Sequence, residues 1–138
     1  MIIDANDMIV GRIATKAAKS ALLGEKVEII NCENAVITGN KDETLNRYKK
    51  KRAMGTHSTG PFIHRMPDRF VKRIIRGMLP YKQQKGREAF KRIRCHIGIP
   101  DEFKEKEAVR YKELSIAKLP TNNYIRIKTI CRFMGAKI

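Results

Sequence analysis

The sequence predicts an α/β fold, a small sheet covered by helices on both faces, and three observations favour this class. Short runs rich in Ile and Val alternate with segments whose apolar residues recur at helical spacing. The 138 residues are 42% hydrophobic, which suffices for one core. The chain has no internal repeat and no linker, so we expect a single domain of residues 1–138.

The first third of the chain predicts strand, helix and strand in that order. Residues 1–4 are an apolar run, and residues 11–23 carry apolar side chains at helical spacing, with Gly24 as a helix stop. Residues 26–31 (KVEIIN) predict a buried strand, and residues 35–38 predict a further short one. This order favours a parallel β-α-β unit.

The middle third predicts three helices. Asn40 is a favoured N-cap with Glu43 three positions later, so a helix begins there and runs to about Lys51, anchored by Leu45 and Tyr48. A second helix starts at Pro67, and a third spans residues 85–92. The second helix carries one apolar stripe, formed by Phe70, Val71, Ile74, Ile75 and Met78.

The last third is less regular. Apolar and polar residues alternate over 93–99, which predicts a strand. Residues 101–118 mix both charges and predict no definite element. Residues 124–127 predict a strand, and a last helix runs to Met134 and is closed by Gly135. We expect Met78 and Leu79 to be buried in the core.

Positive charge is concentrated in the middle of the chain. The formal net charge is +16, from 30 Lys and Arg against 14 Asp and Glu. Residues 1–46 have a net charge of −2 and residues 95–138 of +4, whereas residues 47–94 hold sixteen bases against Asp68 and Glu88, a net +14. These charges repel one another unless a partner neutralises them, so the pattern predicts a polyanion as partner.

Two basic segments predict contact with RNA. The first segment covers the end of the helix that begins at Asn40 and continues into residues 53–66. These residues show neither helical nor strand periodicity, and they contain Gly55, Gly60 and Pro61. Cations bind phosphates and flat rings hold unstacked bases, so we expect this loop to be mobile alone and to order on RNA. A lysine-rich helix end can also be only a solvated face. The candidate contacts here are Arg47, Lys49, Lys50, Lys51, Arg52, His57, Phe62, His64 and Arg65.

The second basic segment follows Pro67 and is rich in arginine. The planar guanidinium suits phosphate oxygens, so we expect arginines to fix the geometry and lysines to add affinity. The candidate contacts are Arg69, Arg73, Arg76, Lys82, Lys85, Arg87, Lys91 and Arg92.

Other functions find little support in the sequence. Gly11 stands alone where a dinucleotide fingerprint needs three glycines. Cys95 and His96 would point to opposite faces of a strand, and Asp68 and Glu88 would each lie in the first turn of a helix. We therefore expect no catalytic, metal, cofactor or small-molecule site.

Cysteine content and hydropathy bear on the environment of the protein. Cys32, Cys95 and Cys131 lack the spacing of a zinc site, so we expect reduced, mostly buried thiols and no disulfide. No apolar run reaches the ~18 residues of a membrane span, and the first ten residues carry no base. We expect a cytoplasmic protein without membrane contact.

Several motifs resemble one family. They are residues 31–41 (NCENAVITGNK), 76–80 (RGMLP), 86–92 (GREAFKR) and 98–100 (GIP). With them the whole chain resembles the universal large-subunit ribosomal protein L-thirteen family, in its shorter archaeal form. Cys95 and His96 depart from it, because bulkier apolar or aromatic residues are expected there.

The resemblance implies a three-layer α/β/α domain with a small, mainly parallel four-stranded sheet and basic extensions. It implies a structural and assembly role on the large-subunit rRNA, beside neighbouring ribosomal proteins and without catalysis. Gly77 and Pro80 would form a turn of that family's basic surface, which would include Arg76, Lys82, Lys85, Arg87, Lys91 and Arg92. Two alternatives stay open, a stand-alone regulatory RNA-binding protein acting off the ribosome and an RNA-modifying enzyme.

Overall fold

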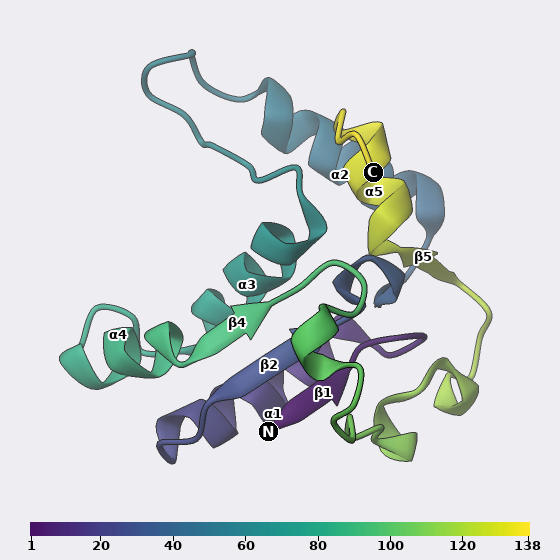
Figure 1. Ribbon diagram of the computed structural model, residues 1–138. Helices are drawn as coiled ribbons and strands as arrows, with labels where there is room; N and C mark the ends of the chain where they lie inside the picture. Colours follow the sequence, from purple (N-terminus) through teal and green to yellow (C-terminus); the bar gives the residue numbers. More distant parts are fainter.

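The computed structural model describes residues 1–138, and its main sheet has three parallel strands. These are β1 (Ile2–Asp4), β2 (Val27–Ile30) and β4 (Ile93–Cys95), in the order β1-β2-β4 (Figure 1). Ile3 pairs with Ile29, and Ile29 pairs with Cys95. The strands predicted near residues 1–4 and 26–31 are confirmed. The third strand ends at Cys95, earlier than predicted. His96 N–H still donates to the Ile29 carbonyl, but the chain turns at Gly98, which has a positive φ and donates its N–H to the Glu33 carboxylate.

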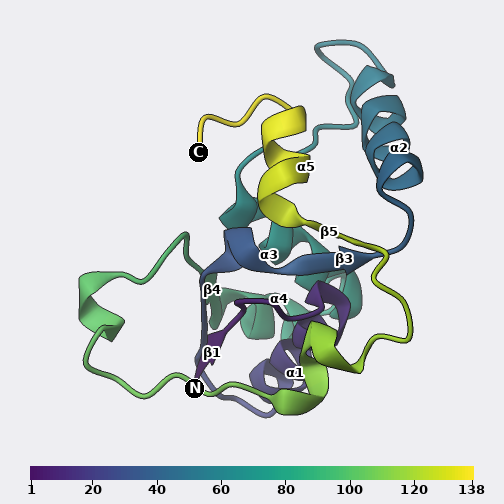
Figure 2. The same cartoon turned by 90° about the vertical axis from the view of Figure 1, so that its right-hand side faces the viewer.

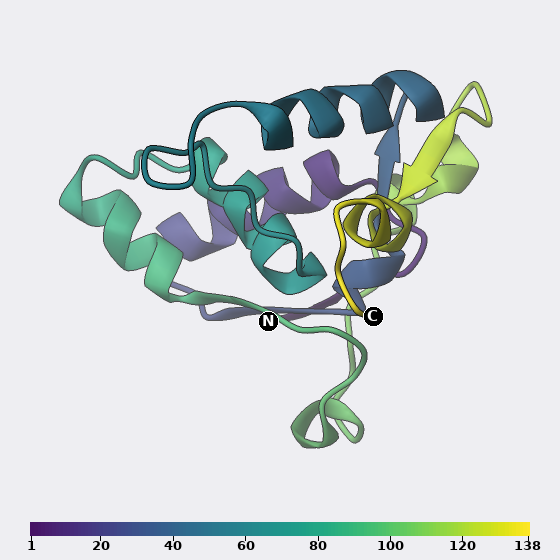
Figure 3. The same ribbon diagram turned by 90° about the horizontal axis from the view of Figure 1, so that it is seen from above.

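Three helices lie on one face of this sheet. They are α1 (Val10–Leu22), α3 (Pro67–Met78) and α4 (Gln84–Lys91), and the other face meets only the segment after β4 (Figures 2 and 3). The predicted helix cover on both faces is therefore wrong. Val27, Ile29 and Ile93 are buried on the face that the helices cover. Glu28 and Arg94 alternate with them along the strands and lie opposite each other on the other face. These charged side chains make the other face too polar to bury a helix.

Two further strands form a separate sheet. β3 (Val36–Thr38) and β5 (Tyr124–Arg126) pair antiparallel, with Ile37 opposite Ile125. The four-stranded, mainly parallel sheet is thus a wrong expectation. Only a 3₁₀ turn, Cys32–Asn34, separates β2 from β3, and a parallel return to the same sheet needs a crossover of about a dozen residues or more.

The two remaining helices, α2 and α5, lie beside each other above α3 in the view of Figure 1. α2 (Lys41–Ala53) begins as predicted, because Asn40 Oδ1 accepts a hydrogen bond of 3.0 Å from Asp42 N–H. Leu45 and Tyr48 pack against the core, as expected. The helix α5 (Ile127–Phe133) contacts α2 (Figure 1).

None of the five α-helices combines the length and the hydrophobicity that a membrane span requires.

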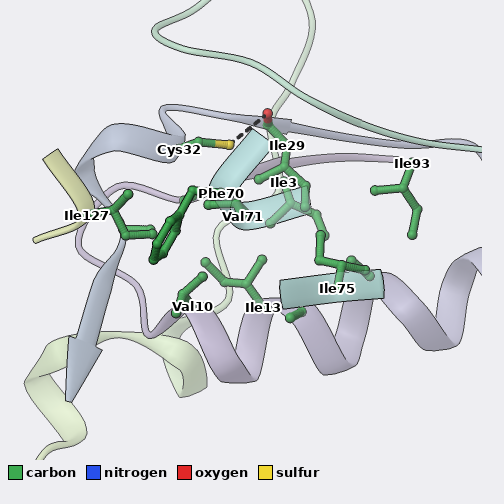
Figure 4. Packing of buried hydrophobic residues seen from close by; sticks show 14 of the residues in the cluster. Ile3, Val10, Ile13, Ile29, Cys32, Phe70, Val71, Ile75, Ile93 and Ile127 are labelled. Atoms are coloured by element: carbon green, nitrogen blue, oxygen red, sulfur yellow. Dashed lines mark hydrogen bonds between the residues drawn. The ribbon is translucent and has the colours of Figure 1, made fainter. Parts of the chain in front are cut away.

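The core lies between the sheet and the helices. Ile13 of α1, Ile75 of α3 and Ile29 of β2 are fully buried and meet there (Figure 4). α1 turns four alanines inward, and these small side chains let it pack closely on α3. Leu79 is buried as predicted, but Met78 is 43% exposed, because it lies at the open end of the α3 stripe.

The three cysteines are free thiols, as predicted. Cys32 Sγ–H donates to the Ile29 carbonyl at 3.5 Å (Figure 4), and a hydrogen bond with Cys95 together with burial raises the Cys32 pKa well above its ordinary value. Burial raises the pKa of Cys131 to about 12. Cys32 and Cys131 therefore stay protonated at neutral pH.

Candidate nucleic-acid interface

The C-terminal end of α2 presents a dense group of exposed bases. The negative end of the helix dipole favours cations there. The cationic groups of Arg47 and Lys51 lie 5.5 and 5.8 Å from the centroid of the Tyr48 ring. Burial raises the pKa of the Tyr48 phenol although Arg47 opposes the shift, so the ring adds no negative charge to this surface.

Residues 54–66 contain no helix or strand, as predicted, yet the tip of this loop is closed by its own contacts. Gly60 N–H donates to the Thr56 carbonyl at 3.2 Å. Gly55 and Gly60 both have positive φ, and a Cβ on Gly55 would overlap the Gly60 carbonyl. Only glycine allows this approach of the two arms. The loop leaves His57, Phe62 and His64 exposed, and Phe62 is 68% exposed.

The polar face of α3 carries four bases at the spacing i, i+3, i+4 and i+7. Arg69, Arg73 and Arg76 were predicted as RNA contacts, and Lys72 was not. Helical periodicity already places Lys72 on the same face, so the sequence contained the signal. These four bases line a hollow of 200 Å³ together with His64 and Phe90. The Lys72 ammonium lies 5.0 Å from the Phe90 ring centroid.

Three hollows share lining residues, and we call the surface that they form together the basic groove. The first, of 340 Å³, and the second, of 380 Å³, share Met54, Pro61, Phe62 and Ile63. The second shares His64 and Arg73 with the third, which is the hollow on α3. No Asp or Glu lines any of them. The cationic side chains of the basic groove are Lys51, Arg52, Arg65, Arg69, Lys72, Arg73 and Arg76.

The basic groove therefore brings together many of the predicted site residues. Besides those cations, it contains the predicted rings of His57, Phe62 and His64. The structure also adds an apolar floor that the sequence did not reveal, formed by Tyr48, Met54, Phe70 and Ile74.

Other predicted residues lie outside the basic groove. Arg47, Lys49 and Lys50 are exposed elsewhere on α2. Lys82, Lys85, Arg87 and Lys91 are exposed on α4 and the turn before it, where Arg87 donates to the Lys82 carbonyl at 3.1 Å.

Arg92 turns inward at the end of α4. It donates to the Ala21 carbonyl at 3.4 Å and lies 3.9 Å from the Glu88 carboxylate. It therefore ties α4 to α1. The prediction that Glu88 lies in the first turn of its helix is wrong. The helix α4 starts at Gln84, so Glu88 lies one turn later, within reach of Arg92.

The turn predicted at Gly77 and Pro80 is also displaced. Gly77 is helical within α3, so the turn begins only after Leu79.

The positive charge of residues 47–94 is almost wholly uncompensated within the protein. Among its sixteen bases, Arg92 alone lies within 4 Å of a carboxylate. Asp68, in the first turn of α3 as predicted, pairs with none of them. The charge of this region is thus left without partners inside the protein.

The remaining titratable residues include Cys95 and His96, which are adjacent in the chain. His96 Nε2 lies 2.8 Å from Glu28 Oε2, while Cys95 contacts Cys32, so the two neighbours face different partners. No three His, Cys, Asp or Glu side chains are grouped so that they could hold a metal ion.

Comparison with known proteins gives a consistent result. The family model described as "Ribosomal protein L13" matches residues 1–102. The "Large ribosomal subunit protein uL13" of Methanococcoides burtonii is 43% identical over 136 residues, covering 99% of this chain and 98% of the relative. Proteins of the same name are 40% identical in Methanosarcina barkeri and 41% in Methanocaldococcus jannaschii, each covering 99% of this chain and 98% of the relative. This chain belongs to the ribosomal protein L13 family.

Proposed function

We propose that this protein is a structural constituent of the large ribosomal subunit that binds and braces rRNA and supports subunit assembly. The uncompensated basic groove is the observation that carries this proposal, together with family membership. The relatives are named as large-subunit proteins, which supports a location of this chain in the cytoplasmic ribosome, beside neighbouring ribosomal proteins. The protein acts without catalysis, cofactor or small-molecule substrate.

Residues 47–94 form the RNA-facing region of a single domain. The arginines of α3 bind phosphates through paired donors, while the lysines at the end of α2 add long-range attraction. Residues 54–66 order against RNA, and the exposed bases of α4 form a second contact area. The RNA contacts are Arg47, Lys49, Lys50, Lys51, Arg52, His57, Phe62, His64, Arg65, Arg69, Lys72, Arg73, Arg76, Lys82, Lys85, Arg87 and Lys91, with Arg92 bracing α4.

Sedimentation of cell extract through a sucrose gradient in moderate salt tests this proposal. A ribosomal constituent travels with the large subunit, and depleting it in cells leaves that subunit incompletely assembled. Protein that stays at the top of the gradient while still binding RNA would instead be the stand-alone regulator. A mass change in bound RNA that requires the protein would reveal an RNA-modifying enzyme. Either result would overturn the proposal.

A further inference from the structure

The second hollow of the basic groove combines an apolar interior with a cationic rim. It lies between α2, residues 61–64 and α3, and its 380 Å³ is within the range of about 300–1,000 Å³ typical of pockets for small organic groups. Six of its ten lining residues are hydrophobic, and Lys51, His64 and Arg73 are its basic side chains.

Aromatic rings form much of this interior. Tyr48 and Phe70 meet at a centroid distance of 5.2 Å and an interplanar angle of 54°. Phe70 is only 5% exposed, so this pair is fixed in the core. Phe62 lies on the opposite arm and lines both the first and second hollows. A Cβ on Gly60 would come 3.0 Å from Phe62 Cδ2, so the missing side chain of Gly60 lets this ring settle against the loop.

The chemistry of the surrounding groove specifies the occupant. Phe62 is largely exposed and lines the second hollow together with Met54, Pro61 and Ile63, so it belongs to a contiguous apolar surface, the kind that marks binding sites. A nucleobase has apolar faces that stack on such rings and polar edges that face water. Arg52 and Arg65 line the first hollow, and Arg69, Lys72 and Arg76 line the third. Both of these hollows share lining residues with the second, so cations adjoin it.

We propose that the second hollow holds one unstacked base of a single-stranded or bulged RNA segment, stacked on Phe62, with the flanking phosphates on the cations of the first and third hollows. This inference rests on the proposed function and adds the class of RNA structure that the groove selects. An apolar protein segment is the competing occupant, but the seven cations and absent carboxylates of the groove favour a polyanion.

The test uses the full chain and a twelve-nucleotide RNA with 2-aminopurine at its centre, compared with the same RNA carrying an abasic central site. Fluorescence anisotropy measures affinity, and 2-aminopurine quenching reports stacking. Phe62→Leu should weaken binding of the intact RNA about tenfold and remove the quenching, because stacking on an aromatic ring is lost. The same variant should bind the abasic RNA as the wild type does. Phe62→Tyr should retain both affinity and quenching.

A matched control distinguishes stacking from general damage. Phe103 packs on His96 at a centroid distance of 5.4 Å, on the segment after β4, outside the groove. Phe103→Leu should leave RNA affinity and quenching unchanged, and thermal unfolding should confirm that both leucine variants are folded.

Two results would overturn the inference. Equal affinity of the wild type for intact and abasic RNA, with no quenching, would leave RNA binding by the groove intact but remove the base pocket. Unchanged RNA affinity of Phe62→Leu, with weaker retention on the large subunit, would assign the hollow to a protein segment. Failure of the wild type to bind any RNA in low salt would instead reject the proposed function itself.

Discussion

The guanidinium carbon of Arg76 lies 4.8 Å from the centroid of the Tyr81 ring. Tyr81 in turn meets the edge of Phe90 at 5.5 Å and 88°, and Lys72 lies over the other ring of this pair. Cations of α3 and rings of the following turn and α4 therefore form one chain of contacts. This chain holds the Arg76 donors in a fixed direction beside the third hollow of the basic groove.

Replacing Tyr81 should weaken RNA binding although Tyr81 lines none of the hollows. Tyr81→Leu removes a cation–π contact of about 0.5–1 kcal/mol and frees Arg76, so affinity for an rRNA fragment should fall about two- to fivefold. Tyr111→Leu is the matched control, because Lys16 lies 5.0 Å from the Tyr111 ring outside the groove. Filter binding at fixed salt measures both. Equal losses in the two variants would contradict a positioning role for Tyr81.

The polar face of α3 should contribute phosphate contacts at little cost in stability. Arg73 is exposed and has no carboxylate partner, so Arg73→Ala should change the free energy of unfolding by less than about 0.5 kcal/mol. Adding Arg76→Ala should lower the free energy of unfolding by about a further 0.5–1 kcal/mol, because the cation–π contact with Tyr81 is lost.

The same double variant should bind RNA with a shallower salt dependence. Each lost phosphate contact lowers the slope of log affinity against log salt by about 0.7–0.9. Lys19→Ala on α1 serves as control, since Lys19 is exposed outside the groove. An unchanged slope in a folded variant would remove these arginines from the interface, whereas a lost fold would contradict their small contribution to stability.

Two helical glycines should respond oppositely to alanine. A Cβ on Gly86 would lie 2.2 Å from the Pro80 carbonyl oxygen, whereas a Cβ on Gly77 would have nothing within 4 Å. Gly86→Ala should therefore destabilise the protein by about 1–3 kcal/mol, because the backbone of the turn must move. Gly77→Ala should stabilise it by about 0.5–1 kcal/mol. Thermal unfolding compares them, and a stabilising Gly86→Ala would show that Pro80 and α4 are not packed together.

Asp4 should make stability depend on acid pH. Burial alone raises its pKa, but hydrogen bonds from Asn31 at 2.8 Å, the Asn6 amide at 3.0 Å and Arg110 at 2.7 Å outweigh burial and lower it. The folded state thus favours the carboxylate. Its stabilisation is present above the unfolded pKa of about 3.9 and is lost as pH falls through the lower folded value.

Asp4→Asn should reduce stability at pH 7 by about 1–3 kcal/mol and flatten the acid limb of the stability curve. Urea unfolding at pH 7, 5 and 3 measures this. Asp101→Asn is the control, since the Asp101 side chain is 92% exposed and its pair with Lys104 is on the surface. Parallel acid limbs for Asp4→Asn and the wild type would contradict the role of Asp4.

Local patterns predicted the elements better than their assembly. The Asn40 cap, the Pro67 start and the apolar stripe around Phe70 depend on neighbours a few residues apart, and the structure confirms them. The pairing of Ile37 with Ile125 joins residues 88 positions apart, so no local pattern could specify it. The polar face of the sheet was visible in the sequence, because Glu28 alternates with Val27 and Ile29 along the strand.

For the basic groove, too, local patterns predicted the parts and not their assembly. The charge density of the sequence pointed to residues 47–94, and helical spacing put Arg69, Arg73 and Arg76 on one helix face. The meeting of Tyr48 with Phe62 and Phe70 in the second hollow depends on how the loop returns from α2 to α3, which composition does not reveal. Arg92 appeared as one more base, and only the structure shows it bound to the Ala21 carbonyl.

The salt dependence of binding to a large-subunit rRNA fragment tests the central claim most directly, namely that the basic groove is neutralised by RNA phosphates. If about six to ten phosphates are bound, released counterions should make affinity fall by about three to five decades between 50 and 200 mM salt. Titrations across this range should give a steep straight line of log affinity against log salt. Tight binding whose affinity stays constant across the same range would contradict the account.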